Sequence, residues 1–469
     1  MTSLSETSSL AGASGQSTGY TIGQSIRFND DDSAYMSRTP SSGGNRKKFT
    51  FSTWFKLGNS GHVNGSDGLF SAVTDSNNFT NIWINNSSYS IDFIQYNGGT
   101  TYRINLPGLL RDPSAWYHLV AIYDSGNAVQ TDRMRLYLNG VRQTTFYQNS
   151  FPALDTDSQV NHTSTLHNIS RAINSGTYNT YYFDGYQTEI HLLDGYAYGP
   201  EYFGEFKEDV GIWIPKEYDG SYGTNGFKID GRDSSDLGDD ESGNGNDFTT
   251  SGLQANDQRA DSPTNNHVTF NPVAPYIDGA TMSFKNGNLD VTNTSSAWGS
   301  SQTTLGIPGS GKWTFAFKLT NSLGGTSYPM FGIIDSRNQT QTDGISLPYQ
   351  SGTPANSMVF VNTYQNSTQA YFFKGGAGSE STIGSAFAHG GATNGEWQWF
   401  VNSDDEELTV YHNGTVRLDA YDISFLTFPV FIAATLYDYD DLRLLNLPGT
   451  EYTPSISGYK AINTTNIGS

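Results

Sequence analysis

Cysteine is absent from the 469 residues, so the chain can form neither disulfides nor thiolate metal sites. A protein of this size that folds in an oxidising compartment usually carries disulfides, and their absence favours folding in the bacterial cytosol. Met1 is followed by small polar residues without a basic or an apolar run, and we expect no signal peptide. No apolar run reaches the roughly 18 residues of a membrane span, so we expect no membrane insertion.

Basic residues are also few, with 25 Lys and Arg against 46 Asp and Glu and a formal net charge of −21. A field of this sign repels phosphate backbones and anionic lipids. It argues against nucleic acid or a lipid surface as a partner. The surplus of carboxylates can serve solubility, or it can bind divalent cations.

The chain has few hydrophobic residues, and many of them are aromatic. Hydrophobic residues make up 35% of the chain and aromatic residues 14%, while the 51 glycines indicate frequent turns. Each aromatic ring buries about 150–250 Å², so rings can build a core where aliphatic side chains are scarce. Because single cores stop growing at roughly 250–300 residues, the length predicts more than one domain. The composition favours short strands over long helices.

Short alternating runs extend from Ser25 to about residue 205. In residues 49–55 aromatic and small polar residues alternate, as in a strand with one buried face. The dipeptide Asn139-Gly140 after a short apolar run favours a tight hairpin, because both residues tolerate positive φ. With no helical period between the runs, the pattern predicts an antiparallel sandwich.

The rest of the chain differs in composition. Residues 1–24 are small and polar, and we expect a flexible or partner-ordered arm. Residues 206–266 are rich in Gly and Asp and are expected to form a connector. Residues 267–469 return to a β pattern, with clean alternation in residues 312–319. The predicted fold class is therefore all-β, with antiparallel jelly-roll sandwiches in tandem at 25–205 and 267–469.

Four motifs of the first sandwich carry a resemblance. They are FSTWF at 51–55, WYHLVA at 116–121, LYLNG at 136–140 and FDGYQTEI at 183–190. In this order they resemble the laminin-G/concanavalin-A-like jelly roll. The resemblance implies a lectin-like sandwich and, by analogy of fold, adhesion to glycans.

Motifs of the second half carry two further resemblances. GKWTF at 311–315, LTVYHNG at 408–414 and FPVF at 428–431 resemble a SPRY sandwich. The sequence has Ala316 where that family usually has glutamate, so no ligand site is carried over. SGNGNDF at 242–248, DSPTNN at 261–266 and YTPSISGYKAIN at 452–463 resemble structural proteins of marine tailed phages. That resemblance implies a homo-oligomeric virion surface protein, assembled in the bacterial cytoplasm, whose partners are capsid, fibre or tail subunits.

No catalytic residues are expected. Glucanases of the concanavalin-like fold carry two carboxylates on one face of a strand, and retaining enzymes need them about 5–5.5 Å apart. Glu189 is the nearest candidate, but His191 and Leu193 occupy the positions two and four residues further along. We therefore interpret Glu189 as a structural acid. Motifs of serine hydrolases, zinc peptidases and P-loop enzymes are missing as well.

Acidic loops are the candidate metal sites. Calcium prefers clustered oxygen ligands on turns, and one stretch supplies a carboxylate every one to three residues. These residues are Asp230, Asp233, Asp236, Asp239 and Asp240. A second cluster is Asp30, Asp31 and Asp32. The alternative for both is a solvated loop without cofactor.

Loops rich in Tyr, Asn and Gly are the candidate glycan sites, because rings stack on sugars and amides bond hydroxyls. The candidates are Tyr178, Tyr181, Tyr182, Tyr218, Tyr222 and Asn225. We expect a non-enzymatic head-fibre, decoration or tail-fibre-like protein that binds host-surface polysaccharide. The alternatives are a purely architectural virion protein without glycan binding and a glycan depolymerase or glucanase.

Overall fold

The computed structural model divides into two compact units between Asn265 and Asn266, which we call the N-terminal unit and the C-terminal unit. It describes residues 19–58, 66–85, 88–108, 110–174, 177–207, 211–273, 276–277, 280–322, 329–335, 356–363, 369–376, 379–388, 395–438 and 440–468. Both units are built from antiparallel sheets, which confirms the predicted all-β fold class.

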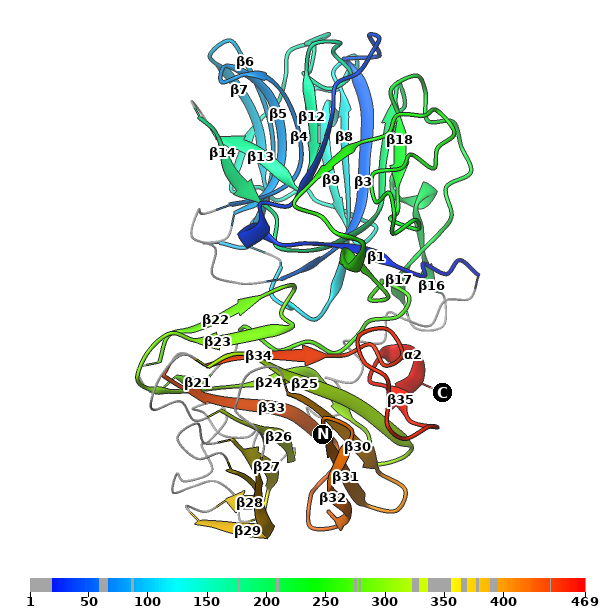
Figure 1. Ribbon diagram of the computed structural model, residues 1–469. Helices are drawn as coiled ribbons and strands as arrows, with labels where there is room; N and C mark the ends of the chain where they lie inside the picture. Colours follow the sequence, from blue (N-terminus) through cyan, green and yellow to red (C-terminus); the bar gives the residue numbers. More distant parts are fainter. Residues whose placement is uncertain are drawn as a thin grey trace. The chain divides into compact units, whose positions relative to one another are not determined.

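Two large sheets form the N-terminal unit (Figure 1). Sheet A runs in the order β10 (Val141–Arg142), β9 (Met134–Leu138), β8 (Trp116–Asp124), β3 (Lys48–Leu57), β15 (Gly185–Asp194), β1 (Ser25–Phe28) and β20 (Gln258–Arg259), and β18 (Phe227–Ile229) also pairs with β15. Sheet B runs in the order β11 (Gln148–Ser150), β7 (Thr100–Asn105), β6 (Ser90–Asn97), β5 (Asn78–Asn85), β4 (Ser66–Asp75), β12 (Leu166–Ile169), β2 (Tyr35–Arg38) and β19 (Thr249–Ser251).

The core of this unit lies between the inner faces of sheets A and B. Phe51 of β3 stacks on Phe70 of β4 at 4.7 Å between ring centroids, and Phe49 contacts Phe93 of β6 at 6.2 Å. Phe49 and Phe51 belong to the alternating run in residues 49–55 that predicted a strand. Aromatic residues do supply much of the core. The predicted hairpin is also present, since Asn139 and Gly140 have φ values of 47° and 78° between β9 and β10.

The outer face of sheet A is buried as well. Trp54 and Trp116, which point away from the core, form an apolar cluster with Tyr186, Ile22 and Trp213. A neighbouring cluster joins the outward side chains of β8 and β15 to Phe203 and Tyr218. Sheet A is therefore covered by a third layer, which includes the hairpin of β16 (Gly204–Lys207) and β17 (Ile212–Pro215).

Residues 206–266, expected to be a connector, are instead part of the N-terminal unit. They supply β17 to the outer layer, β18 and β20 to sheet A and β19 to sheet B. The sequence pattern gave little sign of this, because these strands are only two to four residues long. The physical reason is the outer face of sheet A, whose tryptophan and tyrosine rings must be shielded from water.

The described end of the expected arm also belongs to this unit. Ile22 is buried, and its backbone N–H and C=O both bond the Thr264 hydroxyl. The Tyr20 hydroxyl donates a hydrogen bond to the carboxylate of Glu189 in the interior. Residues 1–18 lie outside the described part of the chain.

The C-terminal unit consists of two further sheets. One runs in the order β21 (Tyr276–Ile277), β24 (Trp298–Ile307), β33 (Val430–Tyr437), β26 (Met330–Asp335), β27 (Met358–Asn362), β28 (Gln369–Gly376) and β29 (Ser379–Ala388). The other runs in the order β22 (Met282–Lys285), β23 (Asp290–Asn293), β34 (Asp440–Leu445), β25 (Lys312–Ser322), β30 (Glu396–Asn402), β31 (Glu407–His412) and β32 (Thr415–Asp422), with β35 (Lys460–Ala461) parallel to β25. Phe331 packs between them against Phe317 and Trp397, at 4.8 and 5.6 Å.

A hairpin and several short helices are the minor elements of the described residues. The hairpin of β13 (Arg171–Asn174) and β14 (Thr177–Tyr182) packs beside β4 and β5 (Figure 1). Short helices in the described residues are η2 (Asp30–Asp32), η3 (Gln130–Asp132), η4 (Pro200–Tyr202), η5 (Ala255–Asp257) and, in the C-terminal unit, α2 (Thr464–Ile467). None of the helices found in the described ranges has the length and apolar character needed to cross a bilayer.

A buried ion pair ties the end of the N-terminal unit to the middle of sheet A. Lys56 of β3 is fully buried, and its Nζ lies 2.8 Å from Oδ2 of Asp261, whose side chain is 4% exposed. Oδ1 of Asp261 accepts a hydrogen bond from the Trp116 indole at 2.9 Å. The pair thus fixes the last segment of the unit onto two strands of sheet A.

Replacement of one member of the Lys56–Asp261 pair should lower the stability of the N-terminal unit far more than loss of a surface ion pair does. Asp261→Ala removes a carboxylate that contacts the buried Lys56 ammonium, and we expect about 3–5 kcal/mol less stability of the N-terminal unit. Asp155→Ala is the control, because its ion pair with Lys47 is solvent-exposed and should contribute less than about 1 kcal/mol. Urea unfolding of the full chain measures both. Equal effects of the two changes would contradict the prediction.

Candidate functional site

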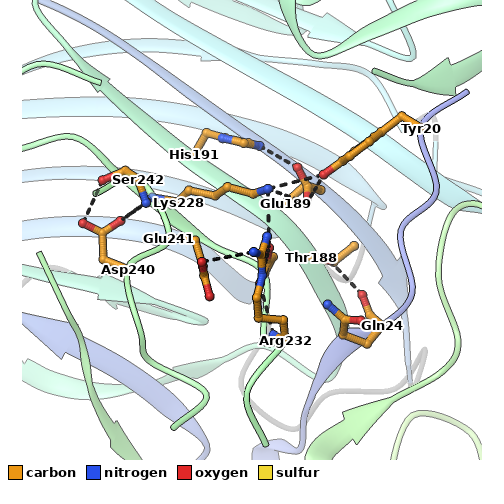
Figure 2. Close-up of polar contacts among 12 residues, drawn as sticks. Tyr20, Gln24, Thr188, Glu189, His191, Lys228, Arg232, Asp240, Glu241 and Ser242 are labelled. Carbon is orange, nitrogen blue, oxygen red and sulfur yellow. Dashed lines mark hydrogen bonds and ion pairs between the residues drawn. The ribbon is translucent and has the colours of Figure 1, made fainter. Parts of the chain in front are cut away.

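A bulge in β15 brings Glu189 and His191 into the outer layer of sheet A (Figure 2). The pairing of β15 with β3 shifts register between Thr188 and His191, and Glu189 has a φ of 47°, which is uncommon for a residue other than glycine. Before the bulge Tyr186 faces outwards and after it Leu193 does, although strict alternation would place residues seven apart on opposite faces.

Glu189 is held by three donors in the interior. Its carboxylate, in a residue only 5% exposed, accepts hydrogen bonds from the Tyr20 hydroxyl at 2.8 Å and from His191 Nε2 at 3.1 Å. Nζ of Lys228 lies 3.3 Å away (Figure 2). Burial alone would raise the pKa of Glu189, but the hydrogen bond from His191, the charge of Lys228 and the Tyr20 hydroxyl lower it to about 2.

Charges of opposite sign alternate beyond Glu189. Nζ of Lys228 also lies 3.4 Å from Oδ2 of Asp230, and Asp230 accepts hydrogen bonds from the Arg232 guanidinium. Arg232 in turn contacts Glu241 at 3.1 Å. The two buried carboxylates, Glu189 and Asp230, are therefore bridged by an ammonium group.

This arrangement is unlike that of a glycoside hydrolase. Such an enzyme needs a carboxylic acid of raised pKa to protonate the leaving group, next to a second carboxylate. The partners of Glu189 shift its pKa the other way, so at neutral pH it holds no proton to donate. The network suits a structural role, as the sequence suggested for Glu189.

A serine and a histidine also meet in this layer, and the tautomer of the histidine decides what they can do. Ser52 Oγ lies 2.9 Å from Nε2 of His118, while the Trp213 indole N–H donates to Nδ1 at 3.0 Å. Because an indole can only donate, Nδ1 must be unprotonated and the ring proton must lie on Nε2. His118 therefore donates to Ser52 and cannot accept its proton. Burial lowers the pKa of His118 to about 3, so the ring stays neutral.

Three of the predicted glycan-binding residues lie in the same layer and are engaged there. Tyr218 is buried against Phe203, with centroids 5.2 Å apart, and its hydroxyl donates to a backbone carbonyl. Tyr222 bonds Nδ1 of His191 at 3.0 Å and stacks on the same ring. Asn225 is buried and bonds Asp194 and a backbone carbonyl. In this conformation these residues bind the chain's own groups.

The predicted tyrosines of β14 lie elsewhere, outside sheet B. Tyr181 is half-buried and meets Trp83 of β5 edge to face at 5.6 Å. Tyr182 is half-buried near Tyr35 at 6.0 Å, and the Arg171 guanidinium lies 3.7 Å from the Tyr35 ring centroid. The side chain of Tyr178 is not among those described. Tyr181 thus lies beside Trp83, an aromatic residue that the sequence analysis missed, whereas the two candidates that contact each other are Tyr218 and Tyr222, at 5.1 Å.

The outer face of sheet B, which holds Trp83, is partly open and combines rings with ordered polar groups. We call this surface the B face. Asp92, fully buried, accepts hydrogen bonds from Trp83 Nε1 at 2.9 Å, from Asn105 at 2.6 Å and from Nε and Nη2 of Arg103 at 2.7 and 2.6 Å. Tyr96 packs on Phe79 close by, at 5.1 Å. A sequence signal for the B face was available in β5, where Phe79, Asn81 and Trp83 alternate with residues of the core.

The predicted calcium ligands do not converge. Asp233, Asp236 and Asp239 are exposed, whereas Asp230 and Asp240 are buried and hydrogen-bonded. No group of three or more His, Asp or Glu side chains suited to hold a metal is found where the structure describes the chain, and this applies also to Asp30, Asp31 and Asp32 in η2. Asp240 instead organises its loop by accepting four hydrogen bonds, from Lys228 N, Ser242 N, Ser242 Oγ and Asn246 N.

Comparison with known proteins agrees with this fold. Residues 29–195 match the family described as the concanavalin A-like lectin/glucanases superfamily, of the laminin-G type. The match covers less than half of the chain and lies within the N-terminal unit. The matched residues include the B face and β15, but not residues 196–265, which contain the hairpin of β16 and β17. No curated protein matches the chain.

Solved structures show weaker similarity. The SPRY domain of human HERC1 is 12% identical, with 38% of this chain and 96% of that chain covered and a TM-score of 0.27. Domains LG4-5 of the mouse laminin α1 chain are 7% identical, with 95% and 88% covered and a TM-score of 0.28. The carbohydrate-binding module CBM66 of Bacillus subtilis is 11% identical, with 37% and 92% covered and a TM-score of 0.25. At these scores the similarities carry no information on ligands.

The low pKa of Glu189 predicts a pH-dependent contribution to stability. The folded chain favours the carboxylate, because the pKa is about 2 instead of 4.5. The gain, roughly 3 kcal/mol at 1.36 kcal/mol per pKa unit, is complete above the unfolded pKa and is lost as the pH falls through the folded one. Glu189→Gln should therefore destabilise the N-terminal unit at pH 7, and its difference from the unmodified chain should shrink between pH 4.5 and pH 2.

Urea unfolding between pH 7 and pH 3 tests this expectation. Glu205→Gln is the control, since Glu205 is exposed on β16 and should be neutral at every pH. A deficit of Glu189→Gln that stays constant across the range would show that the carboxylate charge is not the cause.

The hydrogen bonds within the acidic loop predict that the folded chain is stable without a bound cation. Asp240→Ala removes the acceptor of four hydrogen bonds and should cost roughly 2–4 kcal/mol, whereas exposed Asp233→Ala should cost less than about 1 kcal/mol. Chelation with EDTA should leave the melting temperature of the unmodified chain unchanged. A decrease that added calcium reverses would contradict this and would restore the calcium interpretation.

Proposed function

We propose that the chain is a non-enzymatic surface protein of a bacteriophage particle and that it binds host-surface glycans through the B face. The observation that carries the proposal is the pair of Trp83 and Tyr181, half-buried at 5.6 Å beside polar groups that Asp92 holds in place. Proteins hold sugars with rings against the apolar ring faces and with polar side chains at the hydroxyls, and the B face offers both.

Preorganisation supports the choice of this face. Asp92 accepts four hydrogen bonds from Trp83, Arg103 and Asn105, so these side chains lose little freedom when a ligand binds. The Arg103 side chain is still 32% exposed and can offer its remaining N–H groups. Its charge is balanced by Asp92, and we infer that the B face prefers neutral, hydroxyl-rich sugars.

The absence of catalysis is part of the proposal. It is supported by the depressed pKa of Glu189 and by the His118 tautomer, which leaves Ser52 without a base. The outer layer that contains both groups is filled by aromatic side chains. A depolymerase would need an open site with a protonated acid.

Placement on a virion rests on the sequence. It is supported by the resemblance of residues 242–266 and 452–463 to structural proteins of tailed phages and by the lack of cysteine. We propose capsid, fibre or tail subunits and further copies of this chain as partners. The C-terminal unit would then serve attachment or display. A purely architectural protein remains the second candidate, favoured if the B face packs against another subunit.

Substitutions on the B face test the proposal. Trp83→Ala and Tyr181→Ala in the full chain should each weaken binding to host cells and to neutral polysaccharide roughly tenfold or more, because a stacking ring is lost. Tyr202→Ala is the control, since Tyr202 is 41% exposed and lies with Tyr198 beside the outer layer of sheet A. Glycan arrays and cell-binding assays measure the effect. Binding that is absent from the start, or unchanged in both variants, would favour the architectural candidate.

A further inference from the structure

A cavity of about 310 Å³ lies at the edge of the N-terminal unit, away from the residues considered so far. Most of its lining comes from β9 and the edge strand β10 of sheet A, from the edge strand β11 of sheet B, and from the loop between β10 and β11. We call it the edge pocket. Ligand pockets for small molecules are about 300–1,000 Å³, so a sugar-sized molecule fits.

Part of the lining of the edge pocket is apolar. Met134 belongs to the buried core, and Phe146 and Phe151 pack against that core, with their ring centroids 6.2 Å apart at 74°. Val141 and Tyr147, chain neighbours of lining residues, are 53% and 81% exposed. Apolar surface thus continues from the lining to exposed side chains of the same segment.

The lining also carries two guanidinium groups in different states. Arg142 forms an ion pair with Asp132. Nε of Arg135 is buried and has no hydrogen-bond acceptor, and no ion pair of Arg135 is present within the described ranges. A guanidinium stays charged and presents its donors in a planar fork, and a buried donor without an acceptor costs about 1–3 kcal/mol.

Among the described residues Arg135 shares a buried Nε without an acceptor with Arg417, but the Arg417 guanidinium lies over the Phe387 ring, 4.7 Å from its centroid. Acidic residues outnumber basic ones by 46 to 25, so an acidic partner would have been easy to supply. The amide side chains of Gln143 and Asn149 line the same pocket and provide both donors and acceptors. An unpaired cation, two amides and two phenyl rings together match a small molecule that carries one negative group, several hydroxyls and an apolar face.

We propose that the edge pocket binds an oxyanion, a carboxylate or sulfate group, carried by a sugar ring. Arg135 pairs with the oxyanion, Gln143 and Asn149 bond the hydroxyls, and the ring lies against Phe146 and Phe151. That a sugar carries the oxyanion rests on the proposed function, whereas the preference for an oxyanion rests on Arg135 alone. The site is separate from the B face and complements it, because it selects acidic sugars.

Calorimetric titration of the full chain tests the proposal with four probes. Methyl glucuronide and a sulfated methyl glucoside carry the oxyanion on a sugar, methyl glucoside is the neutral match, and inorganic sulfate carries the charge without the sugar. We expect the two acidic sugars to bind at least tenfold more tightly than methyl glucoside, a difference of about 1.4 kcal/mol. Arg135→Gln should abolish that preference.

Arg111→Gln is the matched control, because Arg111 is exposed and lies outside the lining. Arg135→Gln removes a buried group without an acceptor, so its melting temperature should not fall, and a folded variant keeps the titration interpretable. Equal affinity for glucuronide and glucoside, or unchanged binding in Arg135→Gln, would overturn the proposal. Binding of inorganic sulfate without any of the sugars would overturn its sugar part.

Failure of the edge-pocket proposal can be distinguished by experiment from failure of the proposed function of the B face. Loss of neutral-glycan binding in Trp83→Ala tests only the B face, whereas loss of acidic-sugar preference in Arg135→Gln tests only the edge pocket. Trp83→Ala should keep its affinity for methyl glucuronide, and a loss of that affinity in Trp83→Ala would argue against a separate site.

Discussion

Large side chains project from both faces of sheet A, and neither face can be left in water. The inner face is covered by sheet B, as in any two-layer sandwich. The outer face, with Trp54, Trp116 and Tyr186, needs a third layer, which the chain supplies from Ile22 and from Trp213. The buried ion pair between Lys56 and Asp261, together with the hydrogen bond from Trp116, fixes the last segment of the unit to β3 and β8.

Because the outer face of sheet A must be covered, the outer faces of the two sheets differ in what they expose. The outer side of sheet A is closed, and its titratable groups, Glu189, His191 and His118, are each paired with a neighbour of matching hydrogen-bond character. A fully satisfied network of this kind orders the fold. The outer side of sheet B keeps rings and polar groups partly exposed. The edge pocket of the same unit holds the Arg135 guanidinium, which has no ion pair in the part of the chain that the structure describes.

The sequence predicted what depends on local pattern. Alternation in residues 49–55 and 312–319 indicated β3 and β25, and Asn139-Gly140 indicated the turn after β9. It could not predict the bulge at Glu189, because a bulge depends on how two neighbouring strands align. Nor could it assign residues 206–266 to the first unit, since strands of two to four residues have no period to recognise.

For the candidate site, the residue types were informative and their surroundings were not. Tyr181 and Tyr218 have the same chemistry in sequence, yet one lies half-buried beside Trp83 and the other lies under Phe203. Arg135 shows the same limit, because what distinguishes it is the lack of a partner in space. Exposure and pairing are tertiary properties, which one-dimensional composition does not contain.

The pairing of β1 with β20 has a consequence for how such a unit can be used. Ser25 and Arg259 lie opposite each other in adjacent antiparallel strands, so the chain enters and leaves the sandwich at neighbouring points. A unit whose ends meet in this way can be spliced into a surface loop of another protein, or removed from it, with little strain on the recipient. Evolution could thus move this sandwich between proteins as one intact unit.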